Sequence, residues 1–130
     1  MNIEAMRDTL AKSMAGSIGF PDVVRSLIAE GVESYRADLV RLEETFYMPG
    51  GDSHVEKMDF PQQTIADEFS AAGVVAAIRG SQAGKTKYRE FLKLAMDAGT
   101  TSYVVFLHGK RCIYFGRNGE FHVEEFPGQP

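Results

Sequence analysis

Hydrophobic positions along this chain follow two different periods in turn. Between residues 1 and 31 the apolar side chains recur at the spacing of one helix face, which predicts two short helices. Gly31 is placed to end the second helix, because glycine is the usual residue just beyond a helix C-terminus. From residue 32 to residue 58 the period becomes two, which predicts three short strands joined by hairpins.

The second half of the chain repeats this order of elements. Its hydrophobic pattern predicts two helices and then three strands, over residues 64–79, 86–98, 102–107, 111–115 and 120–125. A glycine-containing joint at 80–84 separates the two helices. The dipeptide Asn118-Gly119 favours a tight hairpin turn before the last strand.

The chain aligns with itself without a gap when residues 11–56 are placed on residues 79–124. In this alignment 11 of the 46 pairs are identical, where unrelated sequence would give roughly three. We therefore predict one domain over residues 1–130, made of internal repeats at approximately 1–61 and 64–127. The expected fold class is α+β: two duplicated αα-βββ units with a mainly antiparallel sheet and helices packed on it.

The first strands of the two repeats differ on one face. In the first repeat, Arg36 and Asp38 make that face polar, whereas residues 103–107 are apolar at every position. A strand that is apolar on both faces should be covered on both. We expect a homodimer to cover the second face, because closed dimers are the commonest assemblies of small proteins. The alternative is that the N-terminal helix or a curled sheet covers it within one chain.

The hydrophobic pattern also predicts which side chains form the core. Eight residues from the expected helices and strands are predicted to be mostly buried: Leu27, Tyr35, Leu39, Ile78, Phe91, Tyr103, Val105 and Leu107.

Composition and charge exclude several classes of protein. The chain is 44% hydrophobic and 25% charged, as an ordinary globular domain is. Its net charge of -4 gives no electrostatic basis for binding nucleic acid. No apolar run approaches the roughly 20 residues that span a membrane, and the N-terminus lacks the apolar core of a signal peptide. The single cysteine, Cys112, suits a reducing compartment, so we expect a cytoplasmic protein.

The most suggestive chemistry is an alternation of acids and histidines in the last strand of each repeat. The candidate ligand-binding residues are Asp52, His54 and Glu56 in the first repeat and Glu120, His122 and Glu124 in the second. Residues two apart lie on one face of a strand, about 7 Å from each other. Such a face could bind a divalent metal or support acid–base chemistry. The alternative is a solvated strand face on which each histidine pairs with a neighbouring acid. No cofactor is assigned.

The order of motifs resembles the YbcV-like family of bacterial proteins, a domain of unknown function whose members sometimes carry the label phage envelope protein. The main matching segments are Phe20-Pro21-Asp22, Gly31 to Leu39, Glu43 to Tyr47, Gly51 to His54, and Gly116 to Glu124. The resemblance spans nearly the whole chain. It implies no reaction, cofactor or catalytic residue.

These observations favour a binding or interaction module that acts as a homodimer, with an unknown small molecule or protein as its partner. An alternative is a metal-dependent or acid–base enzyme that uses His54 with Glu56 and His122 with Glu124. A further alternative, a phage or prophage accessory protein, follows only from the label that the resembling family carries.

Overall fold

A computed structural model describes residues 1–127, which form helices and one antiparallel sheet. The helices are α1 (Ile3–Met14), α2 (Phe20–Ala29), α3 (Ala71–Gln82) and α4 (Tyr88–Asp97). The strands are β1 (Ser34–Asp38), β2 (Glu43–Tyr47), β3 (Ser53–Lys57), β4 (Ser102–Phe106), β5 (Arg111–Phe115) and β6 (Phe121–Glu125). The six strands lie in the order β3-β2-β1-β4-β5-β6 and every neighbouring pair is antiparallel. The predicted α+β fold class is confirmed.

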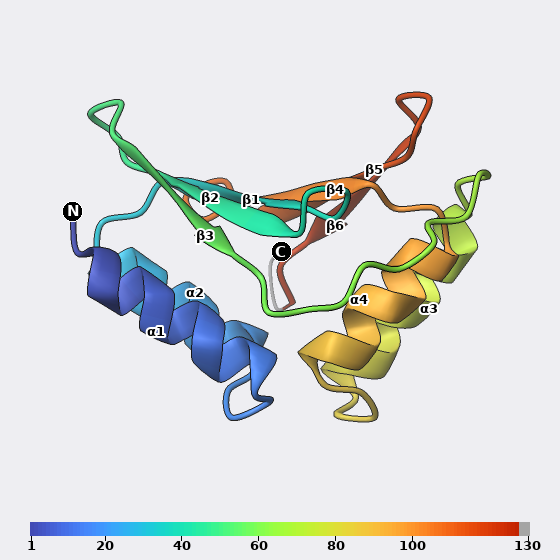
Figure 1. The fold of residues 1–130 in the computed structure, drawn as a ribbon, viewed down its shortest axis with the longest axis horizontal. Helices are drawn as coiled ribbons and strands as arrows, with labels where there is room; N and C mark the ends of the chain where they lie inside the picture. Colours follow the sequence, from blue (N-terminus) through green and yellow to red (C-terminus); the bar gives the residue numbers. More distant parts are fainter. Residues whose placement is uncertain (128–130) are drawn as a thin grey trace.

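All four helices lie on one side of the sheet (Figure 1). The hairpin of α1 and α2 lies below one end of the strands, and the hairpin of α3 and α4 lies below the other end. Within residues 1–127 the opposite face of the sheet bears no helix. We call the face that meets the helices the inner face and the opposite one the outer face.

The elements of the two halves follow the same spacing. The alignment of residues 11–56 with 79–124 can be extended without a gap to cover all of α1 and β3. With this extension, each helix and strand of the second half begins and ends at residues equivalent to the bounds of its counterpart in the first half. The halves join where β1 pairs with β4, and the pair at the centre of this register is Arg36 with Val104, which are themselves equivalent residues. Such a register is what a two-fold axis through the Arg36–Val104 pair would produce. An origin by duplication remains a prediction.

The helices that precede the sheet end in the same way in both halves. Gly31 and Gly99 have φ values of 79° and 89°, a conformation that glycine adopts without steric cost. In each half the next residue donates its N–H to the carbonyl five positions earlier, at 3.0 Å. A side chain at Gly99 would also meet the carbonyl oxygen of Glu68 at 2.3 Å. These glycines therefore turn the chain from helix into strand.

One expected helix begins late. The apolar pattern predicted a helix over residues 64–79, but α3 begins only at Ala71. The preceding segment is irregular because its backbone bonds to the end of α4, with the Ser70 N–H donating to the Ala98 carbonyl at 2.8 Å. Ile65 in this segment is buried in the core without being helical. Its apolar side chain therefore reflects packing into the core and not the face of a helix.

The core lies between the inner face and the helices. The eight side chains predicted to be buried are confirmed, with exposed fractions between 0% and 7%. None of the helices in residues 1–127 is long and apolar enough to cross a membrane.

Candidate functional site

A cavity of about 640 Å³ lies between the inner face of the sheet and the two helix hairpins. Cavities of roughly 300–1,000 Å³ are typical of small-molecule sites. Strands of both halves contribute to its lining, and so do residues from the joints at 16–19 and 84–87. Ser13 of α1 and Ser81 of α3, which are equivalent residues of the two halves, line it from opposite hairpins.

Aromatic side chains form much of the lining. Within residues 1–127 eight aromatic side chains from both halves line it: Phe20, Tyr35, Phe46, Tyr88, Phe91, Tyr103, Tyr114 and Phe126. The rings of Tyr103 and Tyr114 lie 5.2 Å apart between centroids, and Phe91 meets both rings edge-on at 6.3 and 6.2 Å. Such packing fixes the orientation of the rings, so the walls of the cavity are largely rigid and apolar.

A buried carboxylate interrupts this apolar lining. Glu44 lies on β2, points to the inner face and is 5% exposed. The Tyr88 hydroxyl donates a hydrogen bond to Glu44 Oε2 at 2.9 Å. Tyr88 and Tyr103 also share a hydrogen bond between their hydroxyls. Since the Tyr88 proton is directed at Glu44, Tyr103 acts as the donor to Tyr88, and the three side chains form one chain of hydrogen bonds.

Burial changes how Glu44 titrates. Removal from water raises the pKa of Glu44 to about 7, and the hydrogen bond from Tyr88 offsets only part of this effect. Within residues 1–127 no lysine, arginine or histidine forms an ion pair with Glu44. The cavity therefore contains a carboxyl group that changes charge near neutral pH and has no cationic partner from the described chain.

Glu44 was not among the residues that the sequence pattern singled out. Strand β2 begins at Glu43 and makes Glu44 an inward position. The self-alignment of the chain held the signal, because it places Glu44 on Cys112, a buried position of β5. An acid that aligns with a core position is a candidate for a buried charge. Buried charged side chains are uncommon unless they are paired or functional.

The histidine and glutamate candidates lie at the two edges of the sheet. His54 and Glu56 are on β3, and His122 and Glu124 are on β6. Because β3 and β6 are the outermost strands, the structure does not bring the two sets together. These side chains occupy the more buried positions of their strands, on the side that meets the helices. Of these four residues, Glu124 lines the cavity.

Each of these glutamates is bound by an arginine from the first helix of its own half. Glu56 accepts hydrogen bonds from Arg7 of α1 at 3.1 and 3.2 Å, and Glu124 pairs with Arg79 of α3 at 2.7 Å. Burial acts to raise the pKa of both glutamates. Hydrogen bonds from the arginine and from the neighbouring histidine outweigh it and hold the pKa below its usual value. The arrangement fastens each helix hairpin to a sheet edge.

The remaining two candidates precede these strands. Glu120 accepts the Asn118 N–H at 2.8 Å and so closes the hairpin turn before β6. Asp52 is exposed beside the turn before β3. Among the residues that the structure describes, no three histidine, cysteine, aspartate or glutamate side chains are grouped so that they could hold a metal ion.

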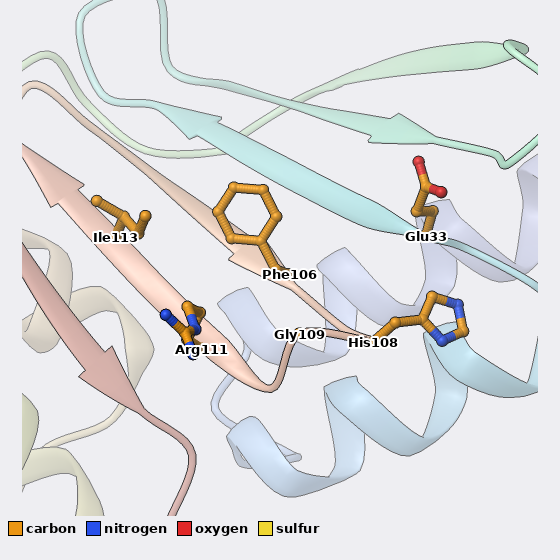
Figure 2. Close-up of a pocket in the computed structure, with 6 residues that line it drawn as sticks. All are labelled: Glu33, Phe106, His108, Gly109, Arg111 and Ile113. Carbon is orange, nitrogen blue, oxygen red and sulfur yellow. The ribbon is translucent and has the colours of Figure 1, made fainter.

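The outer face differs between the halves. In the C-terminal half it carries an apolar surface formed by Val104, Phe106, Ile113, Phe115, Phe121 and Val123. Figure 2 shows Phe106 and Ile113 beside a shallow hollow of about 420 Å³, with Glu33, His108 and Arg111 around them. Since α1 lies on the other side of the sheet, the expectation that the N-terminal helix could cover this surface is wrong.

Fold and site together define an α+β protein whose sheet is covered by helices on one face only within residues 1–127, with an aromatic cavity between the sheet and the helices. The chain belongs to the family of proteins of unknown function DUF1398, which matches residues 8–125. It is 34% identical over 125 residues to uncharacterized proteins of Mycobacterium bovis and Mycobacterium tuberculosis, covering 94% of this chain and 74% of each relative. This confirms the expected membership of a family of unknown function, and the narrower YbcV-like assignment remains a prediction.

Proposed function

We propose that this protein is a binding module that takes a small, largely aromatic organic molecule into the cavity between its helix hairpins. The observation that carries the proposal is the cavity of about 640 Å³, with eight aromatic side chains of the described residues and the buried Glu44 in its lining. A few polar groups in an apolar pocket are typical of sites that orient a ligand. The pKa of the Cys112 thiol is raised to about 12 by burial, which favours binding over thiol chemistry.

Titration with benzyl alcohol, followed by amide chemical shifts, tests the proposal. We expect the largest shifts at the inward positions of β1, β2 and β4, because their side chains line the cavity. Ser81→Trp should weaken the response by placing a ring in the space between the hairpins. Ser26→Trp is the matched control, since Ser26 is an exposed residue of α2 that does not line the cavity. Shifts that Ser81→Trp leaves unchanged would contradict the proposal, as would a cavity that responds neither to benzyl alcohol nor to its ammonium analogue.

A second proposal concerns assembly: the module acts as a homodimer through the apolar outer face of its C-terminal half. Two observations support a second copy of this chain as the partner. The surface is apolar and still accessible, with Phe106 37% and Phe121 63% exposed. Its strand β5 also carries Arg111, which pairs with Glu125 of β6 at 3.3 Å. A two-fold contact can place each of these charges opposite its complement in the other copy.

Sedimentation at micromolar concentration tests the dimer. A species near twice the chain mass of 14.4 kDa is expected, and Phe106→Glu should convert it to monomer by placing a charge in the contact. Val55→Glu is the matched control, because Val55 is exposed on the outer face of the other half. A wild-type protein that sediments near 14.4 kDa would rule the dimer out.

The enzyme alternative draws less support from the structure. His54 with Glu56 and His122 with Glu124 lie at opposite edges of the sheet, and both glutamates are engaged by arginines. The phage-accessory alternative gains nothing from the relatives, which are named only as uncharacterized proteins. A cytoplasmic location belongs to the proposal, and the free, buried Cys112 is consistent with it.

A further inference from the structure

The charges that face the cavity do not balance. Two inner-face carboxylates line it, those of Glu44 and Glu124, and within residues 1–127 the ammonium group of Lys87 is the one basic group in the lining. Glu125 also borders the cavity, but its side chain alternates onto the outer face with Phe121 and Val123. Glu124 is paired with an arginine of α3 and Glu125 with an arginine of β5. Lys87 donates its hydrogen bond to the Gly16 carbonyl at 3.2 Å, where the ends of the two helix hairpins meet. Within the described chain, Glu44 is therefore the lining carboxylate that no cation neutralises.

The other titratable groups around Glu44 do not supply that cation. They are the hydroxyls of Tyr35 on β1, Tyr88 on α4, Tyr103 on β4 and Tyr114 on β5, and the thiol of Cys112 on β5. Burial raises the pKa of all five, so each stays neutral near physiological pH. Only Tyr88 among residues 1–127 donates a side-chain hydrogen bond to Glu44, and it reaches Oε2.

We propose that the ligand of this cavity is an organic cation, an aromatic or alkyl ammonium compound whose positive group lies against Glu44. The inference rests on the proposed binding function and specifies its ligand class. A carboxylate removed from water is stabilised by a partner of opposite charge, which the ligand would supply. The faces of the tyrosine and phenylalanine rings around it attract ammonium groups through their quadrupoles. Carboxylate and rings together therefore select a cation over a neutral molecule of equal size.

Binding of a cation should depend on pH in a defined direction. A bound ammonium group favours the ionised form of Glu44, so the ligand binds best where Glu44 has already lost its proton. Affinity should therefore fall as pH drops through about 7, and binding near that pH should release a proton. A neutral probe of the same shape should show no such dependence.

Benzylammonium and benzyl alcohol form a matched pair of probes that differ mainly in charge. At about pH 8 we expect the folded protein to bind benzylammonium about tenfold more tightly than benzyl alcohol, measured by NMR titration, and to lose most of this preference by about pH 5.5. Glu44→Gln removes the charge but keeps an acceptor for Tyr88. It should abolish the preference, so that benzylammonium and benzyl alcohol bind with similar affinity at both pH values.

Tyr88→Phe provides a second readout that does not depend on the Glu44→Gln variant folding. It keeps the carboxylate but removes a hydrogen bond that lowers the pKa of Glu44, so the pH profile of benzylammonium binding should move upward. Equal affinity for the two probes in the wild-type protein would overturn the cation inference while leaving the proposed binding function standing. Failure of both probes to shift any cavity resonance would overturn the binding function together with the inference.

Discussion

The two halves of this protein have the same backbone plan but different surfaces. Their elements keep one spacing along the chain, and both halves use a glycine of positive φ to turn from helix into strand. At the inner face, however, Glu44 in one half corresponds to Cys112 in the other, and Phe46 corresponds to Tyr114. A symmetric scaffold thus encloses an asymmetric cavity, in which the N-terminal half supplies the buried charge.

The outer faces also differ in polarity, and the N-terminal half again carries the charged residues. Arg36 and Asp38 of β1 make the first half polar where Val104 and Phe106 of β4 make the second half apolar. Backbone geometry constrains helix ends and turns equally in both halves, whereas side chains at a ligand or partner contact are free to diverge. Positions where equivalent residues differ in polarity therefore mark the two surfaces that we propose to be functional.

The largest effect is expected from equivalent core positions. Leu39 and Leu107 are 3% and 1% exposed and follow the first strand of their halves. Truncation of either one, as Leu39→Ala or Leu107→Ala, should lower the free energy of unfolding by about 2–5 kcal/mol through lost burial and a residual cavity. Urea denaturation measures the loss, and Val40→Ala at a 53% exposed neighbour is the control. A large cost in only one half would show that the halves are not packed alike.

Much of this fold could be predicted from the sequence because its signals are local. Alternating strands, helix-ending glycines and the Asn118-Gly119 turn depend on neighbouring residues only, and the structure has these elements within a few positions of the prediction. The late start of α3 could not be predicted, since it depends on a backbone hydrogen bond between Ser70 and Ala98, which are distant in sequence. The order of the strands likewise follows from pairing between the halves.

The candidate site was harder to predict. His54 and His122 could be selected from the sequence because their strands repeat the same alternation of histidine and acids. The topology, however, places these strands at opposite edges of the sheet. The cavity arises where two helix hairpins leave space over the central strands, which no local pattern records. Glu44 could have been found only by asking why an acid aligns with the buried Cys112.

A second prediction concerns the inner-face difference between Glu44 and Cys112. The folded-state pKa of Glu44, about 7, lies above the ordinary value of 4.5, so the folded chain binds this proton more tightly than the unfolded chain. Stability should fall as pH rises from about 4.5 to about 7 and then level off, at a cost of about 3 kcal/mol. Glu44→Gln should recover most of that loss above about pH 7.

Denaturation of both proteins at about pH 5 and about pH 8 measures this effect. The advantage of Glu44→Gln over the wild type should be small at the lower pH and largest at the higher one. Cys112→Ala is the matched control in the other half, because its thiol stays neutral over this range and its substitution should give no such trend. An advantage that does not change with pH would mean that Glu44 is already neutralised by a group of the chain.

The smallest effect is expected where the halves are most alike, at the ion pairs that tie the helix hairpins to the sheet edges. Arg7 and Arg79 are more than half exposed, so water and salt weaken their pairs with Glu56 and Glu124. Arg7→Gln and Arg79→Gln should each lower the melting temperature by a few degrees at most, and by similar amounts. Because arginine holds the pKa of each glutamate down, the stabilisation should be present near neutral pH and disappear as pH falls below the glutamate range. Calorimetric melting at neutral and acidic pH measures both. A much larger loss for Arg79→Gln would indicate that its partner Glu124, which lines the cavity, does more than fasten a hairpin.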